Sequence, residues 1–415
     1  MKCKNLFSVF LFTLLSINGF TQTIAQWRGV DRKGIYNETN LLKFWPVGGP
    51  QMVWSADSIG NGYGSPAITK DAIYITGEKD SIGYLSAFSL NGELRWKSTY
   101  GKEWRGSFPG SRSTPTVTKD LVYVCSGYGN ITCFDSKLGN KKWSVDMKKD
   151  LNGRYTFHGH SESLLIDGDN IFIVAGGVDT NVVALNRFTG KINWICKGVG
   201  QVPGYNSPYM INLPTRKILV TFSAYSLLGI DAVTGELLWA HEQDNYPLAE
   251  RTPGTGDTHS NTILYEDGYI YYIAGDGNCA VKLALSANGK QIIQVWRNKD
   301  IDNFMGGFIK IDSSIYTCTN SKRNLVRLDA STGIVKDSLK CGIGSLIYDG
   351  SLLYYYNQKG LVSLINHDPK NLWVVSSFSV TKGTKEHFSH PVISNGILYI
   401  RHGNSLMAYK VKESS

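Results

Sequence analysis

Three histidines stand at the same place relative to a repeated apolar segment. His160, His259 and His387 each lie three residues before the polar residue that opens such a segment. An imidazole can act as a general base near neutral pH, so the three are candidate catalytic residues. The repeats that carry them are not neighbours along the chain, and their side chains would have to converge across the molecule to share an ion. No metal site is therefore predicted.

The connections that lead into these apolar segments are long and polar. Long loops on a rigid framework are where ligand sites usually lie. Aromatic faces beside Arg and His suit a sugar or an anionic glycan, through stacking and charge-assisted hydrogen bonds. The candidate ligand-binding residues are Trp104, Arg105, Arg112, Arg154, Tyr155, His158, Glu162, Arg251 and Asp257. The alternative is that these are ordinary loop residues, with the histidines bonded to backbone.

The framework that must position these residues is an internal repeat. Its unit is a small residue often followed by Pro, two apolar strands, a Gly turn and then Trp. One copy begins at Ser65-Pro66, continues through Ile73-Tyr74-Ile75 and Asn91-Gly92, and ends at Trp96. Short runs of Tyr, Val and Ile between Gly turns are typical of strands rather than helices. Successive Trp residues lie about 42 to 57 positions apart, which is inside or slightly above the range for four-stranded blades.

Eight copies are legible, and the last lacks a Gly turn and a Trp of its own. They predict an all-β chain that folds as an eight-bladed β-propeller of four-stranded antiparallel blades. Met52-Val53-Trp54, near the start, is an unpaired strand that carries the missing Trp. We expect it to complete the last blade, because an open sheet edge is a liability. No linker divides the array, which predicts one domain over residues 26–412.

The repeated Trp and Asp residues are predicted to be structural. A large aromatic on each outer strand can bury against the neighbouring blade. An Asp before the turn can accept hydrogen bonds from the backbone of that turn. The positions are Trp54, Trp96, Trp143, Trp194, Trp239, Trp296 and Trp373, with Asp135, Asp231 and Asp329.

Residues 1–25 have the pattern of a secretory signal peptide. Lys2 and Lys4 form a basic start, Leu6 to Ile17 an apolar stretch, and Thr23-Ile24-Ala25 a cleavage pattern. The only Cys near this segment is Cys3 in its basic start, so lipid attachment is not expected. We expect a mature protein that begins at Gln26, is periplasmic or secreted, and is soluble, monomeric and without a membrane anchor.

The remaining composition favours anionic partners only in general terms. The formal net charge is +9, of which Lys2 and Lys4 contribute two, and no concentrated run of Lys or Arg suggests nucleic acid. Six cysteines follow the signal, without a C-x-x-C pair. Cys125 and Cys133 fall at mirrored places on two strands of one predicted hairpin. A disulfide between them is one alternative in an oxidising compartment.

One stretch of the repeat resembles a known family. Ile230-Asp231-Ala232-Val233-Thr234-Gly235-Glu236-Leu237-Leu238-Trp239 is similar to the repeat of pyrroloquinoline-quinone-type propellers. That family includes quinoprotein alcohol dehydrogenases and the propeller lipoprotein of the outer-membrane barrel-assembly machinery. Gln26-Trp27-Arg28-Gly29 and the segment from Trp45-Pro46 to Trp54 also resemble exported members. The resemblance spans the mature chain and implies the fold, whereas function depends on the sites that the fold carries.

Three functions follow as hypotheses. The first is an exported, non-redox binding or scaffold module of the cell envelope, with an extracytoplasmic protein or an anionic glycan at one mouth of the central channel. The second is a carbohydrate lyase or hydrolase, with His160, His259 or His387 as base and Arg neutralising a substrate carboxylate. The third is a dehydrogenase that uses pyrroloquinoline quinone with calcium. The resemblance implies an adjacent Cys pair for that role, and because the chain lacks one, no cofactor is predicted.

Overall fold

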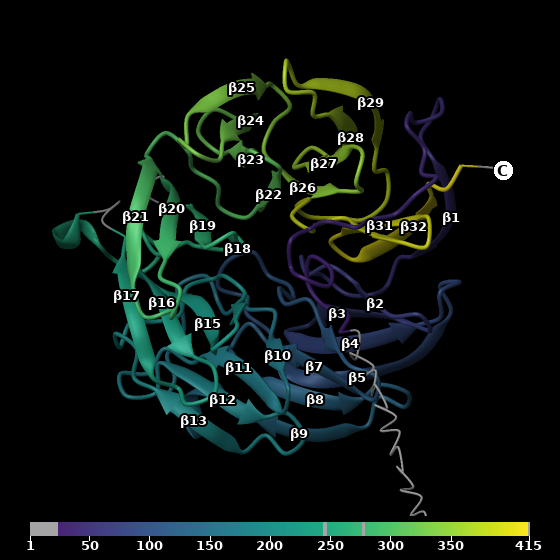
Figure 1. The fold of residues 1–415 in the computed structure, drawn as a ribbon. Coiled ribbons are helices and arrows are strands. Elements are labelled where there is room, and N and C mark those ends of the chain that lie inside the picture. Colours follow the sequence, from purple (N-terminus) through teal and green to yellow (C-terminus); the bar gives the residue numbers. More distant parts are fainter. Residues whose placement is uncertain (1–23, 244–246, 276–278, 414–415) are drawn as a thin grey trace, which may run out of the picture.

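The computed structural model describes residues 24–243, 247–275 and 279–413, so most of the predicted signal lies outside the described residues. Within them, the strands form eight four-stranded antiparallel sheets. The sheets stand in a ring, with the first strand of each blade nearest the centre (Figure 1). The predicted eight-bladed propeller is confirmed.

Blades 1 and 2 contain β2 (Ala67–Ile68), β3 (Ile73–Lys79), β4 (Ile82–Phe88), β5 (Leu94–Lys102), β6 (Thr116–Val117), β7 (Leu121–Cys125), β8 (Ile131–Asp135) and β9 (Lys141–Val145). Blades 3 and 4 contain β10 (Leu165–Asp167), β11 (Asn170–Val174), β12 (Val182–Asn186), β13 (Ile192–Cys196), β14 (Tyr209–Leu213), β15 (Arg216–Ser223), β16 (Ser226–Asp231) and β17 (Leu237–Glu242). Blades 5 and 6 contain β18 (Ile263–Glu266), β19 (Tyr269–Ala274), β20 (Cys279–Leu285), β21 (Ile292–Asn298), β22 (Phe308–Ile311), β23 (Ser314–Thr319), β24 (Asn324–Asp329) and β25 (Val335–Leu339). Blade 7 contains β26 (Gly344–Tyr348), β27 (Leu353–Asn357), β28 (Leu361–Asn366) and β29 (Trp373–Ser379). Two short helices, α1 (Met147–Leu151) and the 3₁₀ turn η1 (Leu248–Glu250), lie in connections between blades.

Blade 8 joins the two ends of the described chain. Its strands β30 (Val392–Ser394), β31 (Ile397–His402) and β32 (Ser405–Lys410) are completed by β1 (Gln51–Ala56), which pairs antiparallel with β32. Trp54 lies opposite Ala408 in this pairing, and the purple and yellow strands lie side by side in Figure 1. The prediction that the Trp54 strand closes the ring is confirmed.

The repeated Trp residues join each blade to the next. The indole nitrogen of Trp194 donates to the carbonyl of Ala232 in the next blade, at 3.1 Å. The ring covers the turn glycine of that blade, where a Cβ on Gly235 would lie 2.8 Å from Trp194. Equivalent indole bonds of 3.0 to 3.2 Å are made by Trp54, Trp96, Trp143, Trp239 and Trp296. The structural role predicted for these six is confirmed.

Trp373 departs from that prediction. It pairs with Asn366 at the start of β29 and is 38% exposed, because it comes three residues too early in the strand. The register position of the other Trp residues is taken by Ser376, opposite Leu364. The hydroxyl of Ser376 accepts a hydrogen bond from the backbone of Trp45, a buried residue of the N-terminal segment. Trp373 is therefore not one of the residues that lock the ring.

The turn residues behave as their types predict. Oδ1 of Asp231 accepts hydrogen bonds from the backbone of Val233 and Thr234, at 3.0 and 3.1 Å. Asp135 and Asp329 make the same pair of bonds in their own turns.

The cysteines of the second blade do not face each other. Cys125 pairs with Ile131 and Cys133 with Tyr123, so the two thiols are offset along the hairpin. Both are free thiols in the structure. The prediction that Cys125 and Cys133 lie at mirrored places on the hairpin is wrong. The turn between the two strands is not centred between the cysteines, so they do not lie opposite each other.

A polar belt links the innermost strands. The backbone nitrogen of Ser65 donates to the hydroxyl of Thr114 at 3.0 Å, that of Thr114 to Ser163 at 3.0 Å, and that of Ser163 to Ser207 at 2.9 Å. The first four blades are thus tied side by side around the channel. The loops that lead into these strands are held at fixed positions as a result.

An N-terminal segment crosses the centre of the ring, and we call residues 26–38 the strap. Arg32 donates to the carbonyls of Ser163 and Leu164 in blade 3, while Arg28 donates to Phe308 in blade 6 at 2.8 Å. The purple trace lies across the centre in Figure 1. The strap runs out of the channel at the end of the propeller where a turn joins the first strand of each blade to its second strand. We call this end of the channel the strap end. The opposite mouth, where long connections enter the blades, is the loop end.

The strap begins where the predicted signal ends. Ala25, the last residue of that prediction, exchanges two hydrogen bonds with Val117 of β6, at 3.0 and 2.8 Å. In the described part of the chain no helix is both long and apolar enough to span a bilayer.

Candidate functional site

Aromatic side chains from five connections meet at the loop end. Tyr63 contacts Phe388 at 5.4 Å between ring centroids, and Phe388 contacts Phe108 at 5.8 Å. The ring centroids of Phe108 and His158 lie 6.4 Å apart, and those of His158 and Tyr205 lie 5.9 Å apart. With Phe157, which touches His158 at 4.9 Å, these residues form what we call the aromatic band. The connections into blades 1, 2, 3, 4 and 8 each contribute to it.

Two members of the band are strongly exposed. Phe108 is 46% and Phe157 57% accessible, whereas Tyr205 is buried. A second aromatic group lies on the same end, where Tyr128 contacts Trp104 at 5.4 Å and Tyr155 at 5.3 Å. Of the predicted ligand residues, the structure therefore brings His158 into the band and joins Trp104 and Tyr155 in this second group.

The connection that carries Phe108 is held in a strained conformation. Phe108 has a φ of +44°, in the left-handed region that residues with a side chain rarely adopt. The guanidinium of Arg112 donates to the carbonyls of Ser107, Phe108 and Gly110, at 2.5 to 3.0 Å. Burial lowers the pKa of Arg112 from its usual value, with Glu103 opposing that effect. Arg112 thus shapes the loop that presents Phe108.

Other predicted cations are also bonded to the protein itself. Arg154 donates to the carbonyls of Gly176 and Gly200, at 2.6 and 2.5 Å. Arg251 donates to Glu242 at 2.6 Å and to the carbonyl of Gln243 at 3.0 Å. Arg105 is exposed. Arg154 and Arg251 therefore brace connections, and Arg105 presents its side chain to solvent.

The predicted acids lie deeper than the band. Asp257 is buried and accepts a hydrogen bond from the backbone of Gly254 at 3.0 Å. Glu162 is buried, accepts from the backbone of Val174 at 3.0 Å, and lies 3.2 Å from Nε2 of His160. Both carboxylates stabilise connections from inside the ring.

The three histidines occupy separate environments. His160 is buried beside Glu162, and His259 is buried with its ring 5.0 Å from that of Phe222. Burial lowers the pKa of His259 to about 4, with the backbone of Ala224 and Gly256 opposing the shift. His387 is half-buried, stacks on His402 at 3.6 Å between ring centroids, and its Nδ1 shares a hydrogen bond of 2.5 Å with the hydroxyl of Tyr356. Burial and His402 lower the pKa of His387 to about 4.

Because His160 and His259 are buried, the three imidazoles do not form an open ring at the channel mouth. Among the described residues, no group of three or more His, Cys, Asp or Glu side chains is placed to hold a metal ion. The equal sequence offset does recur in space, because each histidine lies where a connection enters a blade. At these places two of the rings are enclosed between blades instead of lining the mouth.

Sequence reasoning missed most of the band. Tyr63, Phe108, Phe157, Tyr205 and Phe388 were not singled out, although each lies in a connection rather than in a predicted strand. An aromatic residue in a polar loop was the available signal. Their proximity was not readable, because Tyr63 and Phe388 come from opposite ends of the chain.

Fold and site together define a propeller repeat protein with an aromatic loop end. Residues 81–338 match the family described as outer membrane protein assembly factor BamB, and the chain belongs to that family.

Individual relatives are similar at low identity. The assembly factor BamB of Kangiella koreensis is 28% identical over 219 residues, half of each chain. A quinoprotein ethanol dehydrogenase of Pseudomonas aeruginosa is 27% identical over 159 residues, which are 35% of this chain and 24% of the enzyme. The match thus spans half or less of these relatives. The crystal structure of BamB from Moraxella catarrhalis superposes with a TM-score of 0.62 at 14% identity, over 87% of this chain and 99% of the other, and shows the shared fold.

That the chain binds no pyrroloquinoline quinone stays a prediction from its sequence. The described part of the chain provides no acidic cluster for a divalent cation. Its cysteines include no adjacent pair.

Proposed function

We propose that the protein is a non-enzymatic binding or scaffold module of the cell envelope, and that its loop end holds a segment of an extracytoplasmic protein. Membership of a family described by outer membrane assembly supports the envelope role. The observation that carries the proposal is Phe108, an exposed aromatic on a strained backbone.

Strain of this kind persists only where the surroundings impose it, and it concentrates at functional sites. The exposed ring of Phe108 adds little to the core, yet three hydrogen bonds from Arg112 keep its loop in place. Exposed aromatic anchors that are already fixed bind partners well, because little side-chain entropy is lost on association. The aromatic band has this character.

The chemistry of the loop end supports a protein partner over an anionic glycan. The guanidinium groups of Arg112 and Arg154 donate to main-chain carbonyls, which leaves fewer free N–H donors for an acidic sugar. The exposed members Phe108 and Phe157 are apolar and suit apolar side chains of a partner. Enclosure of His160 and His259 argues against their use as general bases, since a base must reach its substrate.

The test is site-specific photo-crosslinking in cells that export the protein. Benzoylphenylalanine is placed at Phe108 or Phe157, and at Phe188 as a control. Phe188 is 49% exposed, and its turn between β12 and β13 faces the strap end. We expect one protein adduct from the first two positions and none from the third. Phe157→Ser should then weaken binding of that purified protein about tenfold or more.

Two results would overturn the proposal. One is the same set of adducts from Phe188 as from the loop end. The other is an adduct that glycosidase treatment removes, which would assign the aromatic band to a carbohydrate.

A further inference from the structure

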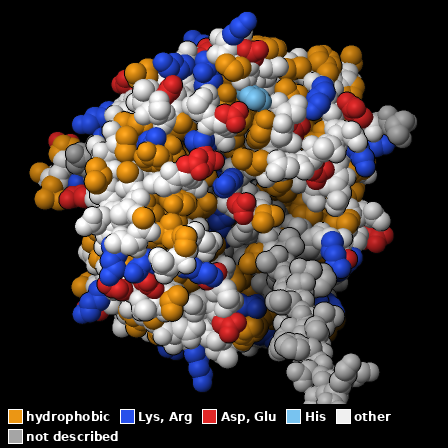
Figure 2. Space-filling view, viewed as in Figure 1, with side chains coloured by type: hydrophobic (Ala, Val, Ile, Leu, Met, Phe, Trp, Pro, Cys, Tyr) orange, Lys and Arg blue, Asp and Glu red, His pale blue; other side chains and the backbone are white. Residues whose placement is uncertain are grey.

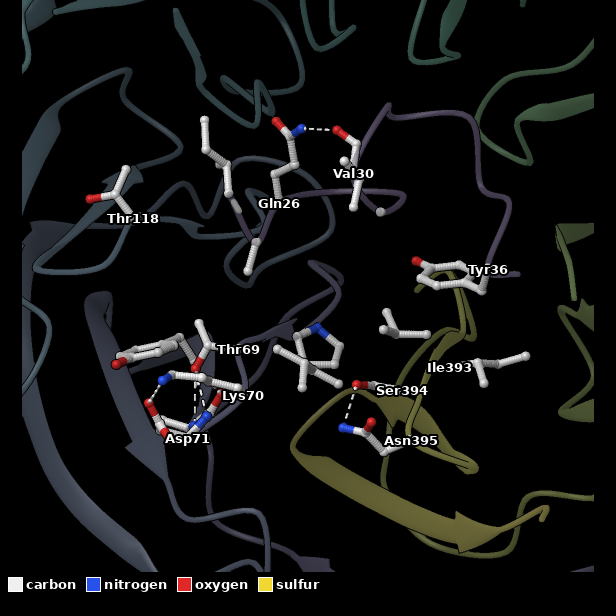
Figure 3. Close-up of a pocket in the computed structure, with 18 of the residues that line it drawn as sticks. Gln26, Val30, Tyr36, Thr69, Lys70, Asp71, Thr118, Ile393, Ser394 and Asn395 are labelled. Atoms are coloured by element: carbon white, nitrogen blue, oxygen red, sulfur yellow. Dashed lines mark hydrogen bonds and ion pairs between the residues drawn. The ribbon is translucent and has the colours of Figure 1, made fainter. Parts of the chain in front are cut away.

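The strap end contains a large cavity on the other side of the channel from the aromatic band. It has a volume of about 1160 Å³ and lies between the strap and the first turns of blades 1, 2 and 8. Figure 3 shows Gln26, Val30 and Tyr36 of the strap on one side of an open space. Thr69 to Asp71 and Ile393 to Asn395 lie across from them.

The inner wall of the cavity is largely apolar. Val30, Ile35, Ile68 and Ile393 line it, and the ring of Tyr36 points toward the open space in Figure 3. Val30 is 65% exposed although the strap around it is fixed. An apolar wall of this extent, open to water, is typical of a binding site for an apolar body.

The strap that forms this wall is preformed. Arg28 donates to the carbonyls of Lys33, Leu346 and Phe308, so it ties the strap to itself and to two blades. The backbone of Tyr36 donates to Tyr348 at 2.7 Å. A ligand would therefore enter an existing cavity and would not have to order the segment.

The rim of the cavity is basic. Its lining includes the cations Lys33, Lys70, Arg95, Lys119 and Lys137. In Figure 2, Lys and Arg side chains are interspersed with hydrophobic ones on the face that carries the strap. Cations beside an apolar wall are the counterpart of an anionic group on an apolar body.

Three acids line the same cavity, Asp31, Glu38 and Asp71, against the five cations, so a net positive charge remains. The carboxylate of Glu38 accepts hydrogen bonds from the backbone nitrogens of Asn395 and Gly396, at 2.6 and 2.7 Å. Asp71 lies 4.0 Å from Lys70, and both are exposed. Within the described residues, the amino groups of Lys33, Lys119 and Lys137 form no ion pair.

We propose that this cavity binds an amphipathic anion, an apolar chain that carries a carboxylate or a phosphate. The chain's own N-terminus is a poor occupant, because residues 1–23 carry Lys2 and Lys4 and no acidic residue. Like charges at the rim would repel it. The anion can come from a free fatty acid or from a lipid headgroup at a membrane surface, and both present the same chemistry.

The test uses the full folded chain and two probes. Parinaric acid, a fluorescent fatty acid, reports the free source, and its methyl ester is the uncharged control. Vesicles of phosphatidylglycerol, against vesicles of phosphatidylcholine, report the membrane source. If the anion is a free fatty acid, we expect the acid to bind better than its ester. If it is a lipid headgroup, we expect the phosphatidylglycerol vesicles to bind better than the neutral ones. Either result supports the site and identifies the source of the anion.

Variants locate the site. Lys119→Glu with Lys137→Glu should weaken binding of the charged probe about tenfold. Lys290→Glu with Lys336→Glu makes the same change of charge at exposed positions of blades 5 and 6 and should leave binding within about twofold. Val30→Asp should weaken binding of the acid by placing a charge on the apolar wall. Thermal melting of each variant checks that it is folded.

The inference is overturned if acid and ester bind equally while both vesicles are ignored. It is also overturned if the Lys119 and Lys137 pair has no more effect than the control pair. Because the cavity and the aromatic band lie at opposite ends of the channel, neither result changes the crosslinks expected at Phe157.

Discussion

At the scale of single residues, His259 and His390 are best understood as neutral structural groups. Nδ1 of His390 accepts a hydrogen bond from Arg28 at 2.9 Å, and Nε2 donates to the carbonyl of Met305 at 2.9 Å. Burial, with the charge of Arg28, lowers the pKa of His390 to about 3. His259 is shifted in the same direction by burial. An enclosed imidazole of this kind resists protonation.

These shifts predict acid sensitivity. The pKa of His259 is about 4 in the folded protein against 6.5 when exposed, so the unfolded chain binds more protons between these values. The free energy of unfolding should have its full value above pH 6.5 and should decrease as the pH drops toward 4. The protonation of His259 should account for up to about 3 kcal/mol of this decrease. Urea unfolding at a series of pH values measures this.

The variant that isolates the effect is His259→Gln, which cannot titrate. Its stability at neutral pH should be lower than that of the natural protein, and its loss between pH 6.5 and 4 should be smaller. Parallel pH dependences for the two proteins would contradict the assignment.

At the scale of elements, the Trp of one blade and the Gly turn of the next form the repeated joint. In blades 1 to 4 the turn Gly lies four residues before the Trp of the same blade. The structure shows the Trp of one blade in contact with the Gly turn of the next. Blade 6 shows how the joint changes when Trp is lost. Asp337 takes the Trp position opposite Arg327 and accepts a hydrogen bond from the backbone of Leu372 in blade 7 at 2.6 Å.

The joint predicts that alanine substitutions at two glycines with nearly equal backbone conformation differ in their cost to stability. Gly235 has φ +79° and lies under Trp194, while Gly268 has φ +82° with open space around it. Gly268→Ala should cost about 1 kcal/mol through backbone strain alone. Gly235→Ala should cost about 1 to 3 kcal/mol more, because the new Cβ also displaces the indole. Denaturant unfolding compares them, and equal losses would show that the indole yields freely.

At the scale of the whole molecule, closure has two components. The β1 strand completes blade 8, and the strap connects blades across the channel. Arg28 reaches blades 6 and 7 and His390 at the entrance to blade 8, while Arg32 reaches blade 3. The two arginines together restrain blades on opposite sides of the ring.

Loss of the strap contacts should therefore weaken the entire ring. Arg28→Ala leaves several buried carbonyls without a donor and should destabilise the fold by about 3 kcal/mol or more. Arg28→Lys should recover little, because an amino group cannot span the same acceptors. Arg105→Ala, at an exposed site, is the matched control. The melting temperatures of the three variants test this role. Equal melting temperatures for Arg28→Ala and Arg105→Ala would contradict it.

The repeat in the sequence is enough to predict the blade number, the closing strand, and the roles of the Asp residues and of six of the seven repeated Trp residues. These depend on spacing within a blade or between neighbouring blades, which a repeat displays directly. Which loop residues meet is visible only in the folded chain. Phe108 and Phe388 join one band, Arg112 and Arg154 turn to main-chain carbonyls, and His160 is enclosed. Those outcomes depend on the three-dimensional course of connections that have no repeat, so contacts between distant parts of the chain set them.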